Sequence, residues 1–158
     1  MNTAKTTVAL DPSLLPDYQS WQRAQSGEFT LWNYIDVRTD LQVAAAFGKL
    51  FWPDFIEHDG YVLLAEQFDP ASVAQWRQEL GDDRAAVERM VNHVHVYDLF
   101  NNNPADTDKT ALAAYLGQVL AQCWHHALHA AFPDKRFTVE YTSEPDDYGP
   151  TISFAQTE

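Results

Sequence analysis

The chain has 158 residues, a length that is typical of one domain and sufficient to bury a hydrophobic core without disulfides or a structural metal. Its 23 acidic and 10 basic residues give a net charge of -13, so most of its surface would repel a phosphate backbone or an anionic lipid surface. We therefore expect binding neither to nucleic acid nor to membranes. Aromatic residues make up 13% of the chain, which excludes a disordered protein.

The distribution of apolar residues and cysteine indicates a cytoplasmic protein. The only apolar run near the N-terminus is Val8-Ala9-Leu10, which is too short for the core of a signal peptide. No apolar stretch approaches the roughly 18 residues needed to span a bilayer. Cys123 is the single cysteine, so no intramolecular disulfide can form. We expect its thiol to be free and buried in the apolar stripe of a long helix.

The N-terminal third is predicted to hold two helices separated by an extended segment. The first helix begins at Asp11 and ends at Ser26-Gly27. Residues 29–35 are rich in aromatic and β-branched side chains, which favours a strand or a packed extended segment. Thr39 is expected to cap the second helix, which ends before Pro53.

The strongest local signal in the sequence is a hairpin in its middle. Asp59-Gly60 is a favoured two-residue turn, and it separates the apolar runs 55–58 and 61–64. A helix capped by Asp69 follows and ends at Gly81, the residue type preferred just after a helix. Directly after Gly81 a further helix is expected.

The C-terminal half is predicted to consist of a long helix and a second hairpin. The short run 94–97 is compatible with a strand or with a helix. The long helix extends from Thr107 to about Phe132, and residues 136–141 and 151–154 alternate as strands do. A long acidic loop joins these two strands.

This order of elements lacks the regular alternation of strands and helices that a parallel sheet requires. We predict an α+β fold in which an antiparallel sheet, built from two hairpins, packs against four to five helices including the long one. No repeat or linker divides the chain. Residues 1–10 are therefore expected to form a flexible N-terminal arm, and residues 11–158 a single domain.

A search for catalytic motifs is negative. The sequence contains no glycine-rich phosphate loop, no nucleophile elbow, no paired-cysteine metal site and no HExxH helix. We therefore predict no enzymatic activity and no cofactor. An active site assembled from residues distant in sequence carries no such motif, so an enzyme stays open as an alternative.

Two pairs of histidines have spacings that metal sites use. His125 and His129 are four residues apart on the long helix and share a face. That face lies opposite the apolar stripe, which favours solvated side chains. His93 and His95 would share a face only if their segment is a strand. No complete ligand set is visible for either pair, so we predict no bound metal.

Two stretches of the chain contain acidic residues and no lysine or arginine. The first lies between Lys49 and Arg77, and the second follows Arg136. Both coincide with the predicted hairpins, and if the hairpins join in one sheet their carboxylates converge. The predicted partner-binding residues are Asp54, Glu57, Asp59, Glu144, Asp146 and Asp147. Such a surface attracts a basic protein and speeds encounter with it.

The first functional hypothesis is therefore a small acidic protein-binding domain, for example an inhibitor or immunity-type protein of bacteria that neutralises a basic toxin or nuclease. The second is an enzyme or a small-molecule-binding domain with an aromatic and histidine-lined pocket. The residues expected to line that pocket are Trp32, Tyr34, Trp52, His93 and His95. A third is an accessory subunit of a larger assembly.

Overall fold

The structure, a computed structural model, describes residues 8–143 and 148–157. Its elements in chain order are the 3-10 helix η1 (Pro12–Leu14), α1 (Pro16–Ala24), α2 (Leu31–Arg38), α3 (Leu41–Phe51), β1 (Phe55–His58), β2 (Tyr61–Leu64), the 3-10 helix η2 (Ala65–Gln67), α4 (Pro70–Leu80), α5 (Arg84–Val91), β3 (Val94–His95), α6 (Val96–Leu99), α7 (Lys109–Ala131), β4 (Arg136–Thr142) and β5 (Thr151–Thr157). The predicted α+β class, with a long helix in the C-terminal half, is confirmed. No helix within the described ranges has the length and apolar character needed to cross a membrane.

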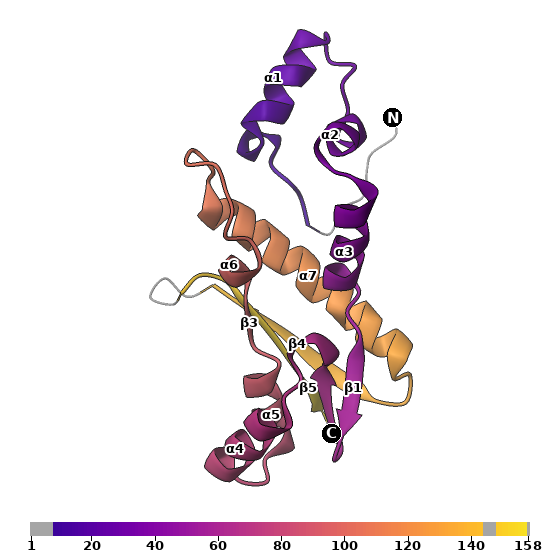
Figure 1. The fold of residues 1–158 in the computed structure, drawn as a ribbon, viewed down its shortest axis with the longest axis vertical. Coiled ribbons are helices and arrows are strands. Elements are labelled where there is room, and N and C mark those ends of the chain that lie inside the picture. The colour runs from indigo at the N-terminus through magenta and orange to yellow at the C-terminus, as the bar shows by residue number, and fades with distance from the viewer. Residues whose placement is uncertain (1–7, 144–147, 158) are drawn as a thin grey trace.

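The strands form two antiparallel sheets rather than one. The first sheet is the hairpin of β1 and β2, in which Glu57 lies opposite Val62. The second has the order β3-β5-β4, and Tyr141 on β4 lies opposite Ile152 on β5. Each predicted hairpin is present, but the two lie in separate sheets. Helix α5 contacts β2 of the first sheet and β5 of the second, and α7 packs against β4 and β5 (Figure 1).

Glu88 on α5 links the two sheets through its side chain. It is fully buried, with 0% of its surface exposed. One carboxylate oxygen, Oε1, accepts hydrogen bonds from the backbone N–H of Val62 on β2 (2.8 Å) and from the Gln156 side-chain amide (2.5 Å). The other oxygen, Oε2, accepts from the backbone N–H of Gln156 on β5 (2.6 Å). Both sheets therefore donate to a single carboxylate.

Asn92 makes a second link one helical turn further along, just past the end of α5. It is also completely buried. Its side-chain oxygen accepts from the N–H of Leu64 (3.0 Å), and its amide donates to the carbonyls of Val62 (3.0 Å) and Phe154 (3.2 Å). Strand edges that face each other across the two sheets thus obtain their hydrogen bonds from side chains. An unpaired buried backbone group would be costly.

The long helix α7 packs along β4 and β5 and buries the main core (Figure 1). Leu120, Trp124 and Leu128 project from it into a cluster that includes Phe154. The indole N–H of Trp124 donates to the carbonyl of Leu50 at 3.0 Å, which fixes the end of α3 against this helix. The second cluster lies between the β1-β2 hairpin, α4 and α5.

The predicted extended segment at residues 29–35 is wrong, because the structure shows helix α2 there. Thr30 and Asn33 form a capping box. The Thr30 hydroxyl accepts from the Asn33 N–H (3.3 Å), and the Asn33 side chain accepts from the Thr30 N–H (2.9 Å). These two reciprocal bonds satisfy backbone donors that a helix start leaves unpaired, and they outweigh the strand preference of the aromatic residues.

Two smaller predictions on helices also need correction. Asp40, and not Thr39, caps α3, because its carboxylate accepts from the N–H groups of Gln42 and Val43. Cys123 is only partly buried, since the buried side of α7 is centred on Leu120 and Trp124. The partial burial raises the pKa of the Cys123 thiol, as expected when an anion loses solvent.

The carboxylate of Glu88 generates the first testable prediction. In Glu88→Gln one oxygen becomes an amide that must face an N–H donor, so at least one buried hydrogen bond is lost and two donors oppose each other. We expect the free energy of unfolding to fall by about 2 kcal/mol, measured by urea denaturation. Glu66→Gln is the control, because Glu66 is exposed and its substitution should leave stability unchanged. A Glu88→Gln variant as stable as the Glu66→Gln control would show that the Glu88 link between the sheets is dispensable.

Gly117 generates the second prediction. Its α-carbon faces the ring of Tyr141, and a Cβ atom would lie 2.6 Å from Cε2 of that ring. Gly117→Ala should therefore be destabilising by about 1–3 kcal/mol, despite the higher helix propensity of alanine. Gly48 on α3 has no atom within 4 Å of such a Cβ, so Gly48→Ala should stabilise by up to about 1 kcal/mol. Thermal unfolding tests this: the melting temperature should fall in Gly117→Ala and rise in Gly48→Ala.

Candidate functional site

The predicted acidic surface is only partly described. Glu144, Asp146 and Asp147 lie outside the described residues. Asp54 pairs with Lys49, whose Nζ is 2.6 Å from Oδ2, and Glu57 pairs with Lys135. Asp59 occupies the left-handed turn position of the first hairpin, with φ of 51°. Lysines from outside the acidic stretch thus offset two of the three described carboxylates.

The two acidic stretches approach β5 at different ends. The Gln156 side chain donates to the carbonyl of Gly60 at 2.9 Å, so the turn of the first hairpin lies beside the end of β5. Thr142 lies opposite Thr151 at the start of β5, where the acidic loop of the second hairpin begins. Thr151 and Gln156 are five positions apart on β5, which corresponds to about 17 Å along a strand. The shared sheet that would bring the carboxylates together is not formed.

The two histidine pairs differ in their surroundings: one pair is in contact at β3, and the other is exposed on α7. His93 directly precedes β3 and His95 is its last residue; their rings lie together, with the Nε2 atoms 3.3 Å apart. His95 also packs edge-on against Tyr148, with ring centres 5.4 Å apart. His125 and His129 are exposed on α7. Within residues 8–143 and 148–157, no three histidine, cysteine or acidic residues are arranged to hold a metal ion.

The five residues of the hypothetical pocket occupy four different places. Tyr34 packs against Tyr18 and Trp21, between α1 and α2. Trp32 projects from the opposite side of α2, and Trp52 is exposed after the end of α3. The histidines at β3 contact each other. This set of side chains does not line one cavity.

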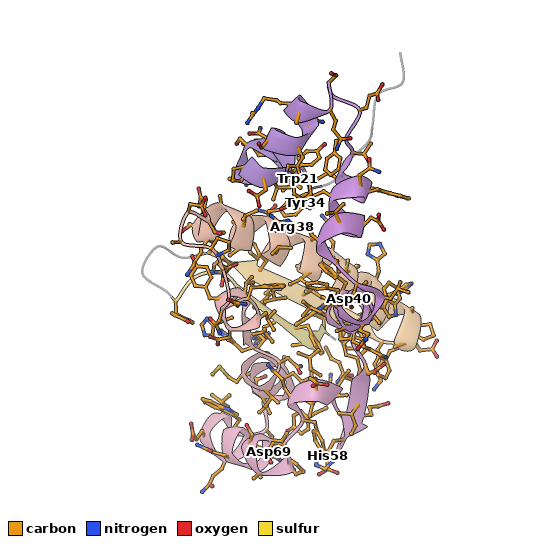
Figure 2. The ribbon with its side chains drawn as sticks, turned by 45° about the horizontal axis from the view of Figure 1, so that its top comes forward. Trp21, Tyr34, Arg38, Asp40, His58 and Asp69 are labelled. Carbon is orange, nitrogen blue, oxygen red and sulfur yellow. The ribbon has the colours of Figure 1, made fainter. Side chains whose placement is uncertain are left out.

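Helices α1 and α2 form a small aromatic unit at one end of the molecule (Figure 1). Figure 2 shows Trp21, Tyr34 and Arg38 gathered between them, far from His58 and Asp69. The Arg38 guanidinium lies 5.3 Å from the centre of the Trp21 ring and 5.6 Å from that of Tyr34. Its charge is paired with Asp17. This face of α2 is therefore occupied from within the chain.

The other face of α2 carries large apolar side chains that nothing in the described chain covers. Trp32 is 86% exposed and Ile35 is 55% exposed. They lie three residues apart, with Asp36 beside them, so they share one side of the helix. Leu41, at the start of α3, is 88% exposed. The chain therefore presents three large apolar side chains to solvent within ten residues.

These side chains line a hollow of about 420 Å³ at the junction of α2 and α3. We define the α2–α3 surface as Trp32, Ile35, Asp36, Asp40, Leu41 and Ala44, all of which border this hollow. A single exposed apolar residue is ordinary, whereas a contiguous apolar patch with a polar rim marks a binding surface. The α2–α3 surface is such a patch, because its apolar side chains are contiguous and Asp36 and Asp40 form a polar rim.

The charge at the rim of this hollow is negative and uncompensated. The basic residues on these two helices, Arg38 and Lys49, are engaged with Asp17 and Asp54. Among the described residues, neither Asp36 nor Asp40 forms an ion pair. A cation approaching the hollow would therefore meet two carboxylates without an ion-pair partner among the described residues, one of which also caps α3 through a single oxygen.

Sequence reasoning missed this surface because it expected a strand at residues 29–35. Two signals in the sequence point to it. The pair Thr30 and Asn33 forms the start of a helix, and Trp32, Ile35 and Asp36 have the spacing of one helix face. The exposure of that face depends on the tertiary structure and has no local signal.

Comparison with known proteins finds no family model that matches the sequence, no similar protein of curated function and no similar solved structure. The function is therefore inferred from the residues of this chain.

Proposed function

We propose that this chain is an acidic protein-binding domain that binds a basic protein on the α2–α3 surface. The observation that carries the proposal is the exposure of Trp32 and Leu41, each above 85%. Large apolar side chains held in solvent on regular helices are the anchors from which protein interfaces obtain most of their binding energy. No catalytic step is part of the proposal.

The apolar contacts supply part of the binding energy of such an interface. Complete burial of one large apolar side chain contributes about 1.5–3 kcal/mol. Trp32, Ile35 and Leu41 lie around one hollow, so one partner segment contacts all three. Ordering of the two chains on association offsets part of this gain.

Charge favours a basic partner. The chain has a net charge of -13, and Asp36 and Asp40 at the hollow are not neutralised from within the described residues. A basic protein is accelerated toward such a surface. The acidic residues proposed from the sequence, Asp54, Glu57, Asp59, Glu144, Asp146 and Asp147, would strengthen this attraction. A basic toxin or nuclease, as in the first functional hypothesis, is a partner of this kind.

The same charges oppose a contact between two copies of the chain. In a two-fold symmetric dimer each surface meets its own copy. The carboxylates of Asp36 and Asp40 would then approach their equivalents, and two bodies of charge -13 would repel each other. The proposal therefore commits to a different, basic protein.

The third prediction concerns Trp32→Ser combined with Leu41→Ser. Both residues are exposed, so the melting temperature should stay nearly unchanged. Proteins captured from the source cells are identified, and each candidate is purified and titrated in a two-component assay. We expect a basic partner whose affinity for the double variant is at least about 100-fold lower, because loss of the two buried side chains removes about 3 kcal/mol or more.

The matched control is Leu80→Ser with Met90→Ser, which removes two exposed apolar side chains from α4 and α5. This control should bind like the unmodified chain. Equal weakening by the two double variants would contradict the proposal, as would a captured partner that is acidic. A purified chain that is dimeric and becomes monomeric in the Trp32 and Leu41 variant would identify a second copy as the occupant instead.

A further inference from the structure

We infer that the hollow of the α2–α3 surface holds an arginine side chain of the partner. This inference rests on the proposed function and specifies the chemical group that the surface recognises. The hollow combines apolar walls, formed by Trp32, Ile35 and Leu41, with the carboxylates of Asp36 and Asp40. An arginine has an apolar stem and a planar cationic end, and it matches both parts of this lining.

The carboxylates have oxygen atoms available for a guanidinium. Asp40 uses Oδ1 to cap α3, where it accepts from Gln42 N–H (2.8 Å) and Val43 N–H (3.0 Å). Its Oδ2 has no hydrogen bond from the described residues, and Asp36 has none at either oxygen. Three acceptor oxygens therefore border the hollow. A guanidinium donates in a fixed planar fork, which suits such a set.

Trp32 supplies a second recognition element. A guanidinium within about 6 Å of an indole face is attracted by the negative face of the ring, and the contact strengthens when solvent is excluded. Trp32 is 86% exposed, so its ring is free to cover an incoming side chain. An apolar occupant would use Trp32 but would remove water from the two carboxylates without replacing its hydrogen bonds.

The chain already holds one of its own arginines in this way. Arg38 lies over the rings of Trp21 and Tyr34 and pairs with the carboxylate of Asp17. Figure 2 shows Arg38 beside Trp21 and Tyr34, between α1 and α2. The outward side of α2 offers an indole and a carboxylate, those of Trp32 and Asp36, which are the same kinds of groups that α1 supplies to Arg38 through Trp21 and Asp17. Arg38 of the chain itself occupies the side that faces α1, and the side with Trp32 faces solvent.

Lysine fits the hollow less well. Its ammonium is a compact, strongly hydrated charge that does not stack on an aromatic face as a guanidinium does and does not bridge two carboxylates in a plane. The arrangement therefore predicts an order of affinity in which arginine exceeds lysine and lysine exceeds a neutral side chain.

The fourth prediction tests this order on the intact protein with small probes. N-acetyl-arginine methylamide, its lysine analogue and its citrulline analogue are titrated into isotope-labelled protein and followed by NMR. Citrulline has nearly the shape of arginine and no charge. We expect the arginine probe to shift the Trp32 indole signal and the backbone signals of residues 35–44, with a dissociation constant on the order of 1 mM. Lysine should bind several-fold more weakly, and citrulline should cause little shift.

The variant for this experiment is Asp36→Asn with Asp40→Asn. Asparagine is a good helix cap, so α3 should persist while both charges are lost. The arginine probe should bind at least fivefold more weakly. The control is Asp83→Asn with Asp106→Asn, because Asp83 caps α5 as Asp40 caps α3, and Asp106 is exposed. This control removes the same charge and should leave the affinity for the probe unchanged.

Three results would overturn the inference. These are equal binding of citrulline and arginine, shifts that map away from residues 32–44, and equal weakening by the two charge variants. Failure here is distinguishable from failure of the proposed function. If the probe does not bind but Trp32→Ser with Leu41→Ser still abolishes partner binding, the protein-binding surface stands and the arginine anchor is wrong. If both experiments fail, the surface itself is not the site.

Discussion

The structure depends on the buried polar side chains of Glu88 and Asn92, which hold β2 and β5 together without direct pairing of those strands. Sheet edges within a core must satisfy their N–H and carbonyl groups, and here α5 and the residue after it supply the partners from two positions one turn apart. The arrangement is specific, because the carboxylate of Glu88 can only accept hydrogen bonds, whereas the side-chain amide of Asn92 can both donate and accept them. It fixes which strand edge faces which and therefore sets the angle between the two sheets and the position of α7 across them.

The N-terminal helices are attached to this body by a narrower connection. Trp124 holds the carbonyl of Leu50, and Phe47 stacks on Phe100, so the second half of α3 is anchored. Helices α1 and α2 pack mainly on each other, around Arg38 and its aromatic neighbours (Figure 2). Because one side of α2 is used for this packing, the side with Trp32 is left facing solvent. The proposed binding surface thus exists because α2 packs against α1 with one side only.

Local signals predicted much of the fold, because turns and caps are decided within a few residues. Asp59-Gly60, with φ of 51° and 85°, forms the expected hairpin turn, and Asp69 caps α4 as anticipated. The further helix expected after Gly81 is α5, which begins at Arg84. Residues 29–35 were misjudged because strand preference and a capping box compete there, and only the second was decisive. Glu88 carries no sequence signal of burial, since its partners are backbone groups 26 and 68 residues away. The exposure of Trp32 is likewise a tertiary property.

Native-state hydrogen exchange tests the central claim most directly. If Glu88 and Asn92 join the sheets into one cooperative unit, the amide hydrogens of Val62, Leu64 and Gln156 should exchange only through global unfolding, together with those of Leu120 in the core. Amides of α1 and α2 should exchange through local opening at a lower free energy. Exchange of Val62 and Leu64 by a low-energy opening that leaves Leu120 protected would contradict the account, because the first sheet would then separate from the body without the loss of its core.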